Sequence, residues 1–246
     1  MWPFSRKKSL LARGILRGWT DWHSHILPGV DDGIPSPEDA LEVLRWYEEQ
    51  GIREVWLTPH VMEDFPNTPA GLQARFEDLQ RLWTGSVRLH LAAEHMLDAL
   101  FEERLTRGEV LPIGPERDSL LVETSCYNAP MNFYELLERI KKAGYHPILA
   151  HPERYPYYSR RHKRYEQLHN AGARFQINIL SFTGYFGEEA RESALWLVKN
   201  GLVDYLGSDM HNVKHAHIIM DYISSKEWRK LSRDLEQTVK NDYITD

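Results

Sequence analysis

The 246-residue chain contains a single cysteine, Cys126. One cysteine cannot form a disulfide within the chain, so a disulfide-stabilised scaffold is excluded. The first residues lack the apolar core of a signal peptide, and no apolar run approaches the roughly 20 residues that cross a bilayer. We therefore expect a protein of the reducing cytoplasm without a transmembrane segment.

The sequence also lacks a broad basic face, because its net charge is -6 and acidic and basic segments are mixed. Proteins that bind the phosphate backbone of nucleic acids need such a face, so nucleic acid is not an expected partner. Trp2, Phe4 and three basic residues near the start could contact an anionic membrane surface weakly. We predict a frayed tail over residues 1–18 and one domain over residues 19–246.

Several motifs of phosphoryl and acyl chemistry are absent. The chain has no GxxxxGK[ST] loop, no GxSxG elbow and no DxD pair of the aspartyl phosphatases. A cysteine-based tyrosine phosphatase needs an arginine six residues after its thiolate, whereas Asn132 stands at that distance from Cys126. A thiolate mechanism is therefore excluded.

What the chain does contain is a regular alternation of strand-like and helix-like segments. Seven β-rich segments recur: "WTDWH", "EVWLTPH", "VRLHLAAE", "SLLVETS", "HPILAH", "RFQINIL" and "DYLGSDMH". Between them lie helical patterns such as residues 36–51, which begin with Ser36 and Pro37 and end at Gly51. This alternation predicts an α/β fold with a parallel sheet, as a distorted TIM-like (β/α)7 barrel. An open doubly wound sheet is the alternative.

Each of the strand-like segments runs into a polar residue, and all but "RFQINIL" run into a histidine or a carboxylate. In a β/α barrel the carboxyl ends of the strands meet around the active site, so these residues are expected to lie together. Imidazole mixed with carboxylate suits zinc, manganese or iron, whereas calcium prefers oxygen alone. The candidates are His23, His25, Asp31 or Asp32, His60, Glu94, Glu123, His151, Asp209 and His211.

Nine candidates are more than one tetrahedral ion requires. We expect two to three divalent ions, with manganese first and iron, zinc or cobalt as alternatives. Closely spaced cations lower the pKa of a shared water and stabilise both oxygens of a phosphoryl displacement. The remaining histidines are interpreted as structural: His90, His95, His146, His162, His169, His215 and His217.

The ordered blocks "DWHSHILPGVDDG", "TPH", "AAEHMLD", "LVETS", "LAHPERY" and "GSDMHN" resemble the polymerase and histidinol phosphatase (PHP) superfamily. Within it, the blocks are most similar to the bacterial capsule-biosynthesis tyrosine-protein phosphatases. The resemblance implies a metal-dependent enzyme that dephosphorylates a tyrosine autokinase controlling capsule or exopolysaccharide production.

The resemblance also implies roles for individual residues. The implied metal ligands are His23, His25, Asp32, His60, Glu94, Glu123, His151, Asp209 and His211, with Asp32 preferred over Asp31. Arg154 would hold the substrate phosphate, because a guanidinium suits two phosphate oxygens. Its structural alternative is an ion pair with a carboxylate such as Glu153. Independently of the resemblance, Tyr155, Tyr157 and Tyr158 directly follow this arginine and could line a groove for an aromatic phosphoester, or these tyrosines pack the loop.

A mechanism follows as a hypothesis. A metal-bridging hydroxide attacks phosphorus in line, while the cations and Arg154 take up the developing charge. The phenol of tyrosine has a pKa near 10, so phenolate is a good leaving group and the reaction depends little on a general acid. His60 or His211 could supply one.

Three alternatives remain at this stage. A PHP-type phosphatase could act on a small ester such as histidinol phosphate. An amidohydrolase also begins with HxH, but usually has a carboxylated lysine where Glu123 stands here. A barrel without turnover could bind the kinase and regulate assembly, although such a protein tends to lose metal ligands, and none is missing.

Overall fold

The computed structural model describes residues 16–159, 161–235 and 239. Most of the predicted tail over residues 1–18 lies outside this range. All seven predicted strand segments form strands. The strands are β1 (Thr20–Ser24), β2 (Glu54–Leu57), β3 (His60–Val61), β4 (Arg88–Leu91), β5 (Glu94–Met96), β6 (Ser119–Glu123), β7 (His146–Ala150), β8 (Arg174–Asn178) and β9 (Tyr205–Gly207).

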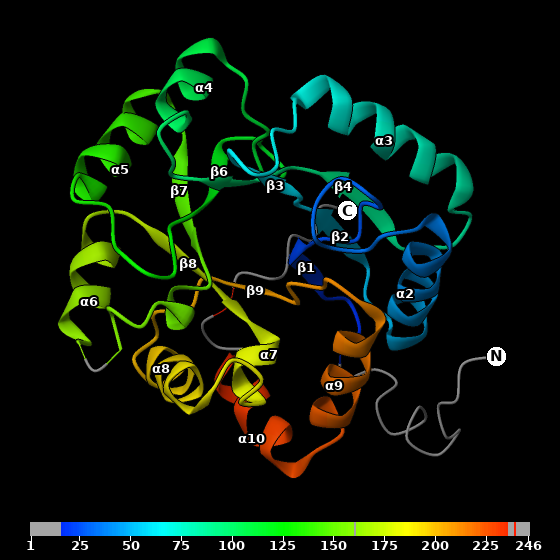
Figure 1. The fold of residues 1–246 in the computed structure, drawn as a ribbon. Coiled ribbons are helices and arrows are strands. Elements are labelled where there is room, and N and C mark those ends of the chain that lie inside the picture. Colours follow the sequence, from blue (N-terminus) through cyan, green and yellow to red (C-terminus); the bar gives the residue numbers. More distant parts are fainter. Residues whose placement is uncertain (1–15, 160, 236–238, 240–246) are drawn as a thin grey trace.

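Helices follow the strands and lie around the outside of the sheet (Figure 1). They are α2 (Pro37–Gln50), α3 (Pro69–Leu82), α4 (Phe101–Arg107), α5 (Phe133–Lys142), α6 (Lys163–Asn170), α7 (Ile179–Phe182), α8 (Glu188–Lys199), α9 (Val213–Ile223) and α10 (Lys226–Leu235), with a 3-10 turn η1 (Pro152–Arg154). None of the helices in the described part of the chain combines the length and apolar character of a membrane span.

Helix α2 shows how the sequence sets these boundaries. The Ser36 hydroxyl accepts a hydrogen bond from the Asp39 N–H and thereby caps the amino end. Pro37 occupies the first turn, where its missing N–H costs nothing. Gly51 ends the helix in the left-handed conformation, at φ 78°. The predicted bounds of 36–51 are confirmed.

All strand pairs are parallel, and the sheet curls into two hydrogen-bonded parts, β1-β2-β4 and β3-β5-β6-β7-β8-β9. The first and last strands meet, because the Asp209 N–H donates to the His23 carbonyl at 2.8 Å and the His25 N–H to the Met210 carbonyl at 3.0 Å. The predicted α/β fold with a parallel sheet is confirmed, and the sheet is curled.

Two predicted strands are interrupted. The segment "EVWLTPH" divides into β2 and β3 at Thr58 and Pro59, and "VRLHLAAE" divides into β4 and β5. Proline has no N–H to donate to a neighbouring strand, and this missing donor explains why the strand is interrupted at Pro59. After the break His60, the first residue of β3, pairs with Glu94, the first residue of β5, so two ligand candidates lie side by side.

Besides the larger core between the sheet and the helices, a smaller apolar cluster fills the inside of the curled sheet. Trp22, Trp56, Leu121, Ile148 and Tyr205 are all nearly inaccessible to solvent and belong to this inner cluster. The larger core lies between the sheet and the helices. Because both faces of the sheet are covered, its central strands are buried throughout, as expected for parallel sheets.

Gly207 in β9 marks a close approach between strands. A Cβ placed there would lie 2.5 Å from the Cβ of His23 and 2.7 Å from Nε2 of Gln176. We expect Gly207→Ala to lower the free energy of unfolding by about 1–3 kcal/mol, because overpacking displaces β1. Urea unfolding measures this loss. Gly71→Ala, in the exposed first turn of α3, is the matched control, and an equal loss in both variants would contradict the explanation.

Candidate metal centre

The structure brings all nine sequence-predicted side chains into one cluster. Seven of them are buried, at 9% exposure or less: His23, His25, His60, Glu94, Glu123, His151 and Asp209. His211 is partly exposed and the Asp32 side chain is 59% exposed, so these two lie at the open side of the cluster. Convergence at one end of the sheet agrees with the prediction.

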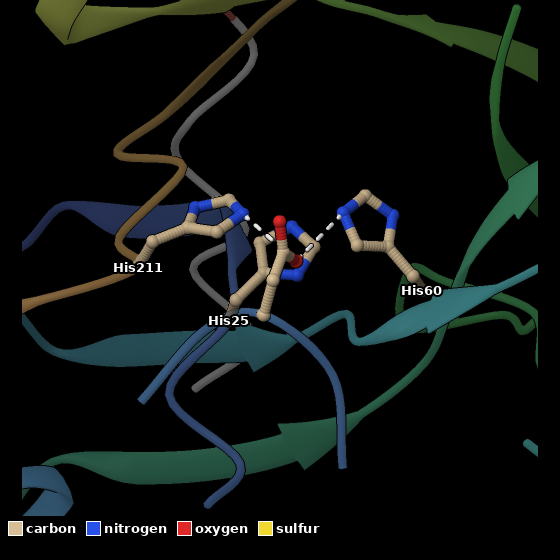
Figure 2. A group of neighbouring side chains, drawn as sticks. His25, His60 and His211 are labelled. Atoms are coloured by element: carbon tan, nitrogen blue, oxygen red, sulfur yellow. Dashed lines mark ion pairs between the residues drawn. The ribbon is translucent and has the colours of Figure 1, made fainter. Parts of the chain in front are cut away.

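Three groups of these side chains place their ligand atoms close enough to hold an ion. They are His25, Asp32, His60 and His211; His23, His25 and Glu94; and His60, Glu94 and Glu123. His60 and His211 lie on the two sides of His25, and Nε2 of each approaches Asp32 Oδ1, at 3.5 and 3.6 Å (Figure 2). His25, His60 and Glu94 each belong to two groups, so neighbouring ions would share ligands.

A chain of buried amides fixes the orientation of His23. The Asp209 carboxylate can only accept, so the Asn178 amide turns its N–H toward Oδ2, at 2.6 Å. Asn178 Oδ1 then accepts from Gln176 Nε2 at 3.0 Å, and Gln176 Oε1 accepts from His23 Nδ1 at 2.7 Å. His23 therefore carries its proton on Nδ1 and turns the lone pair of Nε2 into the centre.

His25 is oriented in the same way by a carboxylate. Its Nδ1 donates to Asp31 Oδ2 at 2.7 Å, which leaves Nε2 unprotonated toward the centre. Asp31 also accepts from the N–H groups of His60 and Gly33. Burial raises the pKa of Asp31, but His25 outweighs it and the pKa falls to about 2. Asp31 thus supports His25, while its neighbour Asp32 faces His60 and His211.

The donor atoms of the centre fit divalent cations. The lone pairs on Nε2 of His23 and His25 face each other at 3.0 Å, and Glu94 Oε2 lies 3.1 and 3.3 Å from these atoms. Within the described residues, neither Glu94 oxygen accepts a hydrogen bond, and neither does Oε1 of Glu123. Such a set of electron-rich atoms repels itself unless positive charge lies between them.

The pKa shifts of these residues also show that the centre favours bound positive charge. Burial lowers the pKa of His23, but the charges of Glu94 and Asp209 outweigh it and raise the pKa to about 9. Burial raises the pKa values of Glu94 and Asp209, yet the surrounding histidines hold both well below their usual range. Without cations, the centre would have to gather protons instead.

Two of the nine residues adopt a strained backbone. His151 has φ 33° and Asp209 has φ 52°, both in the left-handed region that residues other than glycine rarely enter. His151 directly follows β7, and Asp209 lies two residues after the end of β9. Strain of this kind persists where the surrounding contacts fix it, and functional sites are where it concentrates.

Arg154 lies beside the centre, at the end of η1. Its Nη1 donates to Asp209 Oδ2 at 2.7 Å, and the guanidinium lies 4.2 Å from the ring centroid of Phe186. Burial lowers the pKa of Arg154, but Asp209 outweighs it and raises the pKa. Its ion-pair partner is therefore not Glu153, which is buried and accepts from Asn178 N–H and Ser181 Oγ.

The prediction that Tyr155 contacts substrate disagrees with the structure. Its side chain is fully buried, and its hydroxyl donates to the Ala150 carbonyl and accepts from the Thr124 N–H. A buried ring with a satisfied hydroxyl supports the loop and cannot reach a substrate. Tyr157 stacks on Tyr155 at 5.4 Å and is the more exposed of the two.

Sequence reasoning missed three residues that contact the centre. Gln176 and Asn178 lie on β8, whose end lacks a histidine or acid, so no charge signal marked them. His215 was interpreted as structural, yet its Nδ1 accepts from the His211 N–H at 3.3 Å and its Nε2 lies 3.2 Å from the Tyr185 hydroxyl. The other structural interpretations are compatible with their surroundings; His95, for example, accepts from the Leu111 N–H.

The amide relay leads to a prediction. We expect Gln176→Leu to weaken manganese binding by about 10- to 100-fold, because His23 loses the partner that fixes its tautomer. Competition with a fluorescent chelator measures the dissociation constant. Gln50→Leu is the matched control, since Gln50 is equally buried and its amide atoms form no hydrogen bond to described residues. Unchanged affinity in Gln176→Leu would contradict the relay.

Comparisons with known proteins agree with this geometry. A family model described as "Capsular polysaccharide synthesis, CpsB/CapC" matches residues 19–243. The chain is 31% identical over 236 residues to the tyrosine-protein phosphatase YwqE of Bacillus subtilis (strain 168), which covers 91% of this chain and 92% of the relative. It is 30% identical over 232 residues to the tyrosine-protein phosphatase CpsB of Streptococcus pneumoniae, covering 87% and 93%.

Solved structures give the same picture. The crystal structures of YwqE from Bacillus subtilis and CpsB from Streptococcus pneumoniae are described as those of unique metal-dependent tyrosine phosphatases. The match has a TM-score of 0.74 at 26% identity and covers 92% of this chain and 96% of the other. A lactonase from Listeria monocytogenes, at 14% identity and a TM-score of 0.54, shares the fold alone.

Proposed function

Since this chain belongs to the CpsB/CapC family of capsular polysaccharide synthesis, we propose that it is a metal-dependent tyrosine-protein phosphatase. The observation that carries the proposal is the convergence of the nine polar side chains beside one partly buried arginine, Arg154. Its relatives YwqE and CpsB are named tyrosine-protein phosphatases. The reaction is hydrolysis of a phosphoric monoester, with phosphate and a free tyrosine side chain as products.

The metal ligands are His23, His25, Asp32, His60, Glu94, Glu123, His151, Asp209 and His211. When bound, two to three divalent ions supply a water of lowered pKa as nucleophile and stabilise charge on the phosphoryl oxygens. Asp32 is assigned as a ligand and Asp31 as a support, because Asp31 already accepts from His25, His60 and Gly33. Manganese is the expected native ion.

Arg154 orients the substrate phosphate. Its Nη1 is held by Asp209 and its face is covered by Phe186, so the rest of the guanidinium fork is available to phosphate oxygens. The departing phenolate has a pKa near 10, so it needs little protonation. His60 and His211, on the two sides of Asp32 at the open side of the centre, are the candidates to deliver a proton through water.

The substrate is a tyrosine-phosphorylated autokinase that controls capsule or exopolysaccharide production, encountered in the cytoplasm. A protein substrate requires an accessible site, and the exposure of Asp32 and His211 supports this requirement. We also propose that the curled sheet forms a complete TIM-like (β/α)7 barrel. It is supported by the hydrogen bonds that join β1 to the end of β9. The basic start of the chain, proposed to contact membranes weakly, lies outside the described residues.

Kinetics with two substrates test the proposed function. We expect kcat/KM for a phosphotyrosine peptide to exceed that for histidinol phosphate by at least about 100-fold, because a site open to solvent gives a small ester few additional contacts. Release of inorganic phosphate measures both reactions in the presence of manganese. A higher efficiency for histidinol phosphate would assign the chain to small-ester chemistry instead. If the protein hydrolysed neither substrate, the remaining interpretation would be a protein that binds the kinase without catalysis.

A further inference from the structure

A groove of about 260 Å³ lies between the segment that precedes and begins α5 and the start of α6. Its wall on one side is formed by residues 129–134, and on the other by a tyrosine pair and two arginines. The side chains that line it and matter here are Met131, Tyr134, Tyr157, Tyr158, Arg161 and Arg164. None of them is a metal-ligand candidate.

The groove begins next to the metal centre. The Tyr157 hydroxyl lies 2.5 Å from Thr124 Oγ1 and donates to the Ser125 carbonyl at 3.1 Å. Thr124 directly follows Glu123, one of the ligand candidates. The same tyrosine therefore forms a wall of the groove and contacts the strand end that enters the centre. A polypeptide held by the centre could continue along the groove.

Large apolar side chains are exposed at the groove and in the segment beside it. Met131 is 106% exposed and Tyr134 is 43% exposed, and Tyr127, in the same segment, is 89% exposed. Exposed large apolar side chains that gather in one segment indicate an interaction surface. Because this segment follows β6 at the carboxyl end of the sheet, it projects on the same side as the metal centre.

Positive charge lies at the other side of the groove. Arg161, Lys163 and Arg164 are exposed, and within the described residues no ion pair joins them to a carboxylate. They stand at the amino end of α6, where the helix dipole disfavours cations. Helix stability therefore does not explain these charges, whereas an anionic partner would.

We propose that this groove binds the stretch of substrate polypeptide flanking the phosphotyrosine, with Arg161 and Arg164 selecting acidic side chains in that stretch. The inference deepens the proposed phosphatase function and rests on it. Tyr134 and Tyr157 contact the apolar part of the same stretch. The selected substrate class is a phosphotyrosine within an acidic, extended segment.

The experiment compares the wild type with Arg161→Ala/Arg164→Ala on three substrates: an acidic phosphotyrosine peptide, a lysine-flanked one and p-nitrophenyl phosphate. We expect kcat/KM for the acidic peptide to fall about 10-fold, mainly through KM, and to lose its salt dependence. Hydrolysis of p-nitrophenyl phosphate should change less than about 2-fold, because this ester does not reach the groove. Arg229→Ala/Lys230→Ala, which removes two exposed charges from α10, should leave all three unchanged.

A charge reversal separates the inference from effects on folding. Arg161→Glu/Arg164→Glu should prefer the lysine-flanked peptide, a reversal that partial unfolding cannot produce. Equal losses of the double alanine variant on all three substrates would overturn the inference that the groove binds substrate. So would a charge-reversal variant that keeps the wild-type preference for the acidic peptide. If the wild type hydrolyses none of them, the proposed function fails, and the groove is then tested by fluorescence anisotropy of the labelled acidic peptide. If the double alanine variant binds this peptide as tightly as the wild type, the inference about the groove is wrong.

Discussion

Glu94→Gln is expected to lower kcat/KM for a phosphotyrosine peptide by about 1,000-fold or more, even with excess manganese. Glu94 is the central acid of the cluster. Its Oε2 lies 3.1 Å from His23 Nε2 and from His60 Nδ1, and its Oε1 lies 2.9 Å from His151 Nε2. The amide keeps the size of the side chain but removes the charge and turns an N–H toward the histidine lone pairs.

Phosphate release and elemental analysis of the purified variant check this expectation. Removal of metal from the wild type should abolish activity to the same extent, and added manganese should restore the wild type but not the variant. Glu54→Gln is the matched control. Glu54 is also a buried strand carboxylate, but it lies at the amino end of β2 and pairs with Arg88 and His90. Full activity after complete demetallation would rule out the metal mechanism.

Arg154→Ala is expected to lower kcat/KM by about 100- to 1,000-fold, the usual loss when one preorganised donor to developing charge is removed. Arg154→Lys should recover little of this loss, because ammonium is a point charge without the planar fork. Inhibition by inorganic phosphate should weaken in both variants. Steady-state kinetics with phosphate as a competitive inhibitor measure these effects.

The control for Arg154 must account for its contact with Asp209. Metal content should stay at the wild-type level, because Asp209 is also held by the Asn178 amide. Arg174→Ala removes an arginine that pairs with Asp204 at the amino end of β8, and it should retain activity within about 3-fold. If Arg154→Ala lost metal together with activity, its role would be structural and the phosphate assignment would be wrong.

The sequence by itself determined the order of strands and the histidine or carboxylate that follows every predicted strand except β8. Parallel strands in an alternating β/α chain deliver their carboxyl ends to one edge, so the grouping of His23, Glu123 and Asp209 followed from local pattern. The family resemblance added Arg154, whose place beside Asp209 is compatible with its predicted role. Local spacing suffices here because each strand carries its own terminal residue into the centre.

Only the tertiary structure decided how these residues are supported. Tyr155 and Tyr157 are neighbours in the chain, yet one is buried under the loop and the other lines a groove. Gln176 became part of the centre because β8 packs beside β9, and its amide has no charge that a sequence pattern could mark. Burial and hydrogen-bond direction depend on neighbours distant in sequence, so they exist only once the sheet has curled.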